Sequence, residues 1–470
     1  MKISQRLVGV VLSTVLTQAR NVFYYDEEHP HLPDPKVTAD VDHVNIAHAK
    51  SSIFTTNPAG EYAPFQNLSS LKAHFKPDTK FLISIGGWGD IGFRKAAATE
   101  DSRKLFASNI AELLKKLSLD GVDIDWRYPG GNGDDYRQVL NWDLAAEPGT
   151  YPLLLSEIRS AIGSKKILSI AAPGKPENMI VYTPHNATSI WNLVDWVNVM
   201  TYDLMDRRDG ITKHHTDVET SLKIVDHYID NLKLEPHKIN LGFAMFAKWF
   251  KVDPMEKCET GLGCITLLLE TQDGIDTQSS GSITFETANL APPPSNITET
   301  TDGTCGPEIF KTCKKGHCCS IYGYCGTTED YCNNCEGVAY GSGCKAVSLK
   351  SQFQTAMLNG ITDSKMGGQY YYDRTRSTFW TWETPDLIAQ KFEKIMAARK
   401  LGGVMVWSLG EDSYDNSHLI AIREGNSYLK DPSAYQKKKP NNVAKPIQPI
   451  QSPQPEPKPQ PSKTHWWKFW

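Results

Sequence analysis

The chain has no run of apolar residues long enough to cross a bilayer. The longest, residues 7–16 near the N-terminus, is well short of the about 20 residues that a membrane helix needs. There is also no excess of charge of either sign, because 50 basic and 54 acidic residues leave a net charge of −4. A nucleic-acid-binding surface needs a basic field, which this balance does not supply. We therefore expect neither a membrane span nor a nucleic-acid partner.

The first 19 residues have the pattern of a secretory signal peptide. Lys2 and Arg6 form the basic start, an apolar stretch follows, and Thr17 and Ala19 occupy the −3 and −1 positions of a cleavage site. The alternative is that the segment forms a buried first strand. We expect a secreted protein, either extracellular or associated with a cell wall.

The cysteines support export. There are ten, an even number, and eight of them lie between Cys305 and Cys344. This density is typical of a disulfide-stapled module in an oxidising compartment. A zinc cluster is the alternative, but the adjacent Cys318 and Cys319 and the lack of paired CxxC knuckles argue against it. We accordingly expect no metal and no cofactor.

Short apolar runs alternate with segments of helical periodicity along most of the chain. In the segment 102–117, for example, Leu105, Phe106, Ile110 and Leu113 recur at helical spacing, and 386–400 is also helical in pattern. Strands that alternate with helices predict a parallel sheet, and eight of them predict a (β/α)8 barrel of the α/β class. The eight expected strands are residues 21–25, 43–49, 80–85, 121–126, 167–172, 196–201, 239–246 and 403–409.

The stretch between the last two expected strands is too long for one helix and predicts an insertion. It contains an isolated pair of cysteines, Cys258 and Cys264, then the cysteine-rich segment and an aromatic stretch at 370–382. Past residue 430, prolines interleaved with Lys and Gln predict an extended, disordered tail. The expected parts are a signal peptide (1–19), a barrel (20–250 and 381–428), an insertion lobe (251–300 and 346–380), a cysteine module (301–345) and the tail (429–470).

The segment 119–130 has the highest density of charged side chains that could take part in catalysis. Alternate side chains of a strand share a face, so Asp123, Asp125 and Arg127 are expected to point the same way, toward the barrel mouth. Two carboxylates close together there perturb each other's pKa and can transfer protons or stabilise charge. The alternative is a purely structural ladder of ion pairs.

Here the sequence resembles glycoside hydrolase family 18, the chitinases. Residues 120–130 are similar to the family's signature, and residues 84–88, 200–203 and 402–407 are similar to its third-, sixth- and eighth-strand motifs. The resemblance covers nearly the whole barrel. It also implies a small α+β lobe at the place of the insertion.

The resemblance implies a substrate-assisted mechanism, an exception to the usual two-carboxylate scheme. The position of Asp125 orients the acetamide N–H of the substrate, Asp123 supports it, and the Tyr202 hydroxyl binds the acetamido carbonyl. A glutamate at the last position of the signature would protonate the glycosidic oxygen. The implied binding residues around them are Trp88, Met200, Asp203 and Trp407, the last as the floor of the pocket.

The sequence departs from the family at this acid. Arg127 occupies its position, and a guanidinium, with a pKa above about 12, cannot hand over a proton. We expect Arg127 to pair with Asp125, and with Asp203 if it comes within reach. Lys248 also replaces an arginine that often ends the seventh strand. A weakly active enzyme stays an alternative, in which Glu411 or Asp412 supplies the proton.

The cysteine module resembles the hevein-type chitin-binding module. That family's pairing implies the bridges Cys305–Cys319, Cys313–Cys325, Cys318–Cys332 and Cys335–Cys344, which leaves Cys258 and Cys264 to pair with each other. A segment this short cannot build a core and needs its bridges. The implied sugar-binding residues are Ser320, Tyr322, Tyr324 and Tyr331. The alternative is that these tyrosines only cover the disulfides.

Taken together, these patterns predict a secreted chitinase-like protein that binds chitin or chitooligosaccharides without efficient hydrolysis. An inserted hevein-like module resembles the arrangement in fungal proteins such as the chitinase-type subunit of yeast killer toxins. Two alternatives remain, a weakly active chitinase and a subunit that docks a toxin or partner to chitinous walls. We expect the barrel cleft still to hold sugar above an Arg127–Asp125 pair, unless Arg127 itself fills the central subsite. No feature of the sequence specifies a protein partner.

Overall fold

The structure, a computed structural model, describes residues 19–286 and 296–433, apart from 308, 321, 333, 334, 338 and 345–347. Residues 1–18 of the expected signal peptide, the three prolines at 292–294 within the expected insertion lobe and the part of the expected tail beyond 433 lie outside this part of the chain. None of the helices in the described ranges has the length and hydropathy needed to span a bilayer.

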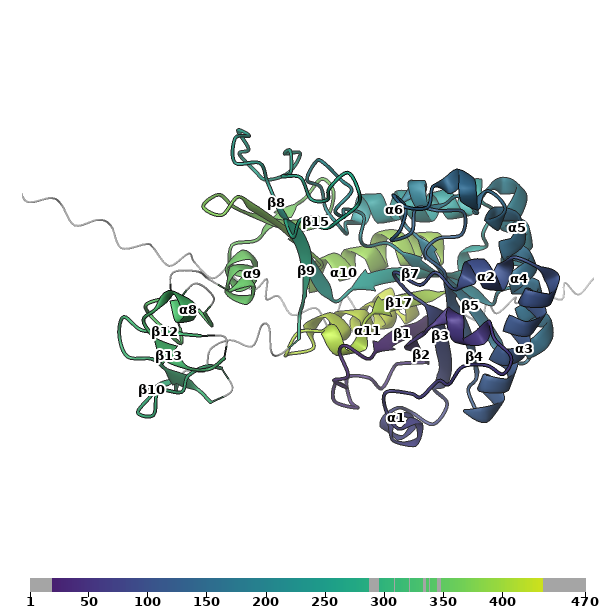
Figure 1. Ribbon diagram of the computed structural model, residues 1–470, viewed down its shortest axis with the longest axis horizontal. Coiled ribbons are helices and arrows are strands. Elements are labelled where there is room, and N and C mark those ends of the chain that lie inside the picture. The colour runs from purple at the N-terminus through teal and green to yellow at the C-terminus, as the bar shows by residue number, and fades with distance from the viewer. Residues whose placement is uncertain are drawn as a thin grey trace, which may run out of the picture.

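Eight parallel strands form a closed barrel, as the alternating pattern predicted (Figure 1). Their order around the barrel is β1-β17-β7-β6-β5-β4-β3-β2, so that the first and last strands in the chain are neighbours. All carboxyl ends therefore meet at one mouth. The strands are β1 (Arg20–Asp26), β2 (His43–Ala49), β3 (Lys80–Gly86), β4 (Gly121–Asp125), β5 (Ile167–Pro173), β6 (Trp196–Met200), β7 (Ile239–Ala244) and β17 (Gly403–Trp407).

The helices cover the outside of the barrel and bury their apolar stripes against it (Figure 1). The helix expected at 102–117 begins earlier because Thr99 and Ser102 cap its N-terminus reciprocally. The segment 386–400 is an α-helix continued by a π-helical turn, Phe392–Ala397. The helices around the barrel are α1 (Leu68–His74), α2 (Phe93–Ala97), α3 (Glu100–Lys116), α4 (Glu147–Ile162), α5 (Pro184–Trp191), α6 (Val218–Asp226), α10 (Pro385–Lys391) and α11 (Ser417–Lys430).

The insertion builds a five-stranded antiparallel sheet in the order β14-β15-β16-β8-β9. The expected seventh strand, 239–246, is wrong at its end. Phe246 already belongs to β8, where it pairs with Thr284 of the insertion sheet. One apolar run thus serves two sheets, and apolarity alone cannot show where the chain turns. The elements of the insertion are β8 (Phe246–Lys251), β9 (Ser280–Thr284), α9 (Leu349–Leu358), β14 (Ile361–Asp363), β15 (Gly368–Asp373) and β16 (Thr378–Trp382).

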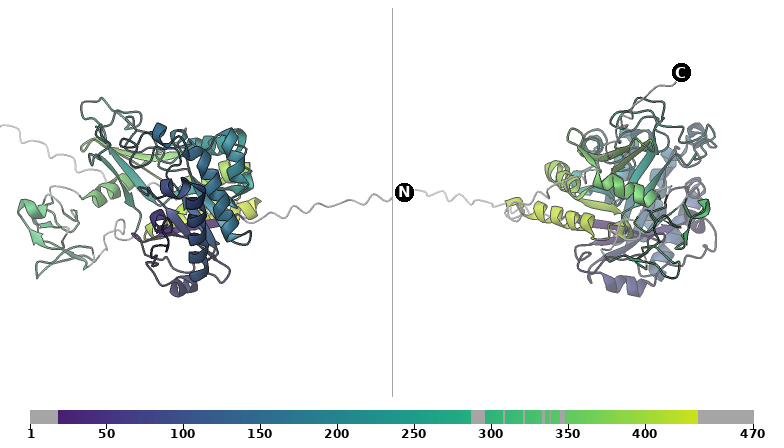
Figure 2. Two further views of the ribbon diagram at one scale, coloured as in Figure 1. Left: turned by 45° about the vertical axis from the view of Figure 1, so that its right-hand side comes forward. Right: turned by 90° about the vertical axis from the view of Figure 1, so that its left-hand side faces the viewer.

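The cysteine-rich segment lies outside the barrel, next to α9 (Figures 1 and 2). Its short elements are the strands β10 (Thr298–Glu299), β11 (Lys311–Thr312), β12 (Cys318–Cys319) and β13 (Cys325–Gly326) and the helix α8 (Glu329–Cys332). All five predicted disulfide pairings are confirmed: Cys305–Cys319, Cys313–Cys325, Cys318–Cys332, Cys335–Cys344 and Cys258–Cys264.

Candidate functional site

Asp123 lies in the middle of β4 and is fully buried inside the barrel. Both of its oxygens are saturated by four side-chain donors from other strands, which are Tyr24 (2.7 Å), Ser84 (2.8 Å), Ser169 (2.6 Å) and Asn198 (3.1 Å). Burial raises the pKa of Asp123, and the nearby charge of Asp125 raises it further, while these hydrogen bonds act in the opposite direction. The residue is held rigidly and has no free lone pair directed at the mouth.

Asp125, two residues on, contacts the Arg127 guanidinium and the His48 imidazole. The Arg127 guanidinium donates from Nε to Oδ1 and from Nη2 to Oδ2, both at 2.8 Å. The Nε2 atom of His48 lies 3.1 Å from Oδ2 as well. Burial would raise the pKa of Asp125, but Arg127 and His48 outweigh it and hold the pKa well below its usual range. The predicted pairing of Arg127 with Asp125 is therefore present.

Arg127 also covers the aromatic ring expected to floor the pocket. Its guanidinium carbon lies 5.7 Å from the centre of the Trp407 ring. Trp407 is further stacked on His48, with ring centres 5.3 Å apart and planes at 21°. A cation over an aromatic face is itself a favourable contact. Arg127 thus takes the place that the apolar face of a sugar would need on this ring.

A cavity of about 290 Å³ remains at the mouth, between the barrel and β9 of the insertion. This is at the lower limit of the roughly 300–1,000 Å³ typical of ligand sites. Arg127 forms part of its wall. The cavity also includes the predicted binding residues Trp88, Met200, Tyr202 and Asp203. Trp88 is 46% exposed, and the guanidinium carbon of Arg208 lies 5.5 Å from the centre of its ring.

Two predicted site residues have partners that sequence reasoning did not foresee. Asp203 is bound by Lys248 (Nζ to Oδ1, 2.8 Å), whereas Arg127 binds Asp125. The expected Arg127–Asp203 pair is thus replaced, because β8 carries Lys248 up to the mouth. The hydroxyl of Tyr202 is buried and contacts the Met405 sulfur at 3.5 Å.

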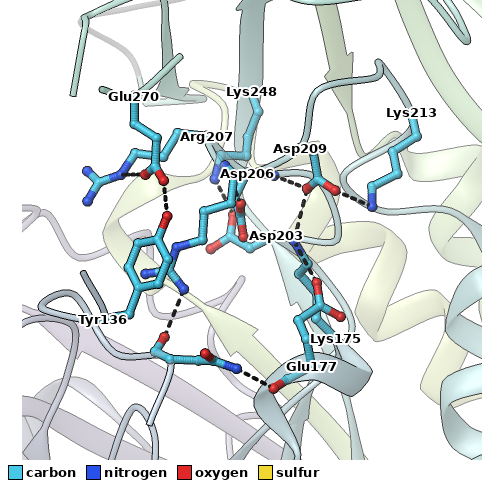
Figure 3. A network of polar contacts seen from close by, with 12 residues as sticks. Tyr136, Lys175, Glu177, Asp203, Asp206, Arg207, Asp209, Lys213, Lys248 and Glu270 are labelled. Atoms are coloured by element: carbon cyan, nitrogen blue, oxygen red, sulfur yellow. Dashed lines mark hydrogen bonds and ion pairs between the residues drawn. The ribbon is translucent and has the colours of Figure 1, made fainter. Parts of the chain in front are cut away.

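A network of charged side chains surrounds the opening of the cavity (Figure 3). No sequence motif predicted this network. Lys175 binds three carboxylates, those of Glu177 (3.1 Å), Asp206 (3.0 Å) and Asp209 (2.9 Å). Its members come from different loops, which only the closed barrel brings together. Further contacts of the network include those of Arg207 with Glu270, Tyr136 with Glu270, Lys213 with Asp209 and Lys248 with Asp203.

Neither of the two alternative proton donors, Glu411 and Asp412, lines the cavity. Glu411 lies beside His29, with Oε1 3.3 Å from Nδ1, and burial raises its pKa to about 8. Asp412 lies 2.8 Å from the Nδ1 of His418 and accepts the backbone N–H of Leu419. Among the described residues that line the cavity, neither carboxylate is present. The hypothesis that one of them replaces the missing acid therefore has no geometric support.

The tyrosines of the cysteine module divide into two groups. Tyr322 is 80% and Tyr324 57% exposed. Tyr331, by contrast, packs against the buried disulfide cysteines of the module. Ser320 is buried, and its Oγ accepts the backbone N–H of Tyr324 at 3.3 Å. The reading that the tyrosines only cover disulfides fits Tyr331, whereas Tyr322 and Tyr324 have rings open to solvent.

A (β/α)8 barrel with carboxylates at the carboxyl end of a strand is the architecture of a large class of barrel enzymes. Residues 20–412 match the model of the glycosyl hydrolases family 18, and the chain belongs to this family.

Known relatives are similar to part of the chain. Chitinase A1 of Niallia circulans is 36% identical over 146 residues, which are 30% of this chain and 20% of that protein. Sporulation-specific chitinase 2 of Saccharomyces cerevisiae is 32% identical over 37% of this chain and 34% of that protein. The oviduct-specific glycoprotein of Bos taurus is 26% identical over 43% and 38%. The chain therefore spans less than half the length of each of these relatives.

Solved structures share the fold over most of both chains. The family 18 N-acetylglucosaminidase of Paenibacillus barengoltzii superposes with a TM-score of 0.57 at 20% identity, covering 87% of this chain and 99% of that one. Catalytic domain 2 of the Group II chitinase of Ostrinia furnacalis superposes with a TM-score of 0.60 at 18% identity, covering 87% and 97%.

Proposed function

We propose that this chain is a secreted protein that binds polymers of N-acetylglucosamine and does not hydrolyse them efficiently. The observation that carries the proposal is the bidentate Arg127–Asp125 pair at the end of β4. A missing general acid costs roughly 10²–10⁴ in rate. In this chain the residue in the acid's position also immobilises its neighbour.

The Arg127–Asp125 pair would prevent a substrate-assisted mechanism in two ways. Arg127 does not release a proton to a leaving group, since Asp125 raises its pKa well above the ordinary value against the effect of burial. Both oxygens of Asp125 are occupied, so this carboxylate cannot turn to accept an acetamide N–H without breaking a buried ion pair. Loss of the acid and loss of the orienting group come from the same contact.

Binding is supported by what the site keeps. The cavity retains the solvent-exposed aromatic side chain of Trp88 together with the polar groups of Tyr202 and Asp203. Family 18 chitinases of the same fold have been solved with (GlcNAc)4 and with a longer N-acetylglucosamine oligomer. An aromatic wall with a few polar groups is the usual composition of a sugar subsite.

We assign the second binding surface to the cysteine module, in line with its resemblance to hevein-type domains. Tyr322 and Tyr324 present two flat rings to solvent on a scaffold held by four disulfides. Such rings stack on the apolar faces of sugars. The disulfides fit a secreted protein.

The test measures binding to chitin and hydrolysis of chitooligosaccharides with one preparation of the full chain. We expect retention on insoluble chitin and no product above background from soluble chitooligosaccharides. Turnover within tenfold of an active family 18 chitinase would contradict the proposal. So would failure to bind both the polymer and the oligomers.

A further inference from the structure

Three side chains that could bind a metal converge behind the barrel mouth, outside the cavity. Asp26 is the last residue of β1, His29 follows three residues later, and Glu411 lies in the short helical turn Leu409–Glu411 after β17. Because β1 and β17 are neighbours in the barrel, their carboxyl ends lie side by side. One ligand atom from each of the three residues lies within 4.8 Å of the other two.

The hydrogen bonds of this cluster do not satisfy all its members. The Nδ1 of His29 lies 2.9 Å from Asp26 Oδ1 and 3.3 Å from Glu411 Oε1, yet one ring nitrogen carries at most one proton. The second oxygen of Glu411, Oε2, is buried without a hydrogen-bond partner among the described residues, in a side chain only 4% exposed. A buried carboxyl oxygen without a partner costs free energy whether or not the group is protonated.

The geometry points to a divalent cation held by Asp26, His29 and Glu411, with zinc as the best fit. One imidazole nitrogen and two carboxylate oxygens are ligands that zinc accepts, and the two carboxylates balance its charge. Tetrahedral bonds of about 2.0–2.2 Å separate neighbouring ligand atoms by about 3.3–3.5 Å. The 3.3 Å between His29 and Glu411 already fits, and the 2.9 Å between Asp26 and His29 must open by about half an ångström.

The surroundings complete the site. The backbone N–H groups of Glu28 (3.0 Å) and His29 (2.9 Å) donate to Oδ1 of Asp26, the oxygen that faces His29 Nδ1, and the Ser408 hydroxyl donates to Oδ2. These bonds fix the orientation of the Asp26 carboxylate, and an ion would replace only the proton between Oδ1 and Nδ1. The His29 side chain is 21% exposed, which gives a path for the ion and a fourth position for water. From the sequence we expected no metal. Asp26 and His29 are three residues apart, but Glu411 follows His29 by 382 residues, from 29 to 411, so no motif joins the three.

A bound ion would join the first and last strands of the barrel at their carboxyl ends. Ser408, which donates to Asp26, directly follows Trp407. We therefore assign the ion a structural role, holding the segment that carries this ring.

The test uses the full chain, stripped with a chelator and titrated with Zn²⁺ by calorimetry and by thermal unfolding. We expect one ion per chain and a higher Tm with Zn²⁺ than without. His29→Asn and Glu411→Gln should each weaken binding at least tenfold. His31→Asn, an exposed histidine in the same loop, is the matched control and should bind as the wild type does.

Two outcomes would overturn the assignment. One is a wild-type chain that binds no Zn²⁺ up to millimolar concentration. The other is an affinity that His29→Asn and Glu411→Gln leave unchanged. If one of the two variants fails to fold without metal, Co²⁺ is added to the variant that folds and its visible absorption spectrum is compared with that of the wild type. Loss of a metal ligand changes this spectrum. An unchanged Co²⁺ spectrum in the folded variant would likewise refute the site.

Discussion

Arg127 and Asp125 form a two-pronged ion pair in which Nε and Nη2 of the guanidinium each lie 2.8 Å from a different carboxylate oxygen. The two residues lie on the same face of the chain at the end of β4, where the resemblance to family 18 places an acid and the carboxylate that works with it. The same guanidinium covers Trp407. If these positions have the roles that the resemblance implies, Arg127 alone affects the proton donor, the orienting group and the floor of the cleft together.

Arg127→Glu is expected to give measurable cleavage of chitooligosaccharides, because it restores an acid and frees Asp125. Arg127→Gln is the matched control, since it opens the cleft equally without an ionisable proton and should stay inactive. Product release is measured by chromatography. A folded Arg127→Glu variant without activity would show that other changes, such as the Lys248–Asp203 pair, also block the reaction.

Lower pH should not restore cleavage to the wild-type chain. The pKa of Asp125 is held well below its usual value of about 3.9, and that of Arg127 well above its own. A depressed carboxylate pKa contributes stability that is present above the unfolded value and lost only as pH falls through the folded one. The pair therefore persists at pH 5. A rise in turnover at pH 5 relative to pH 7 would contradict this.

Arg127→Ala should destabilise the fold by about 3–5 kcal/mol, because it leaves the buried charge of Asp125 without its main partner. The double variant Asp125→Ala with Arg127→Ala should lose less than the sum of the two single variants. The free energies of unfolding are measured by urea titration. Additive losses would mean that the pair contributes no coupling.

Tyr322→Ala combined with Tyr324→Ala should lower affinity for insoluble chitin about tenfold or more. Each aromatic contact contributes roughly 0.5–1.5 kcal/mol beyond its burial. Tyr414→Ala is the matched control, because Tyr414 is 47% exposed but lies on the barrel. Unchanged retention of the double variant would leave the barrel cleft as the binding site.

The contribution of the cleft to binding is measured in the Tyr322→Ala, Tyr324→Ala double variant, in which the cysteine module is expected not to bind sugar. There Trp88→Ala should weaken binding of N-acetylglucosamine oligomers, whereas Trp407→Ala should change it little, because Arg127 covers the Trp407 ring. The readout is calorimetric titration. If Trp407→Ala alone abolishes binding, the sugar displaces Arg127 and the central subsite is open.

Much of the fold follows from local patterns. The strand at 43–49 coincides with β2, and the others begin or end within a few residues of their expected bounds, because alternation of apolar runs with helical periodicity is a property of neighbouring residues. The disulfide pairing followed from family resemblance. The end of the seventh strand could not be predicted, since the run that continues to Phe246 is apolar in both sheets.

Within the candidate site, the sequence predicted one contact, because alternation along the strand, continued two residues past Asp125, puts Arg127 on the same face. Only the tertiary structure decided the rest. It placed Lys248 against Asp203, Arg127 over Trp407 and Glu411 beside His29. These pairs join residues of different strands and loops, and closure of the barrel brings them within reach. Sequence spacing carries no information on such distances, since they depend on how the strands close into one ring.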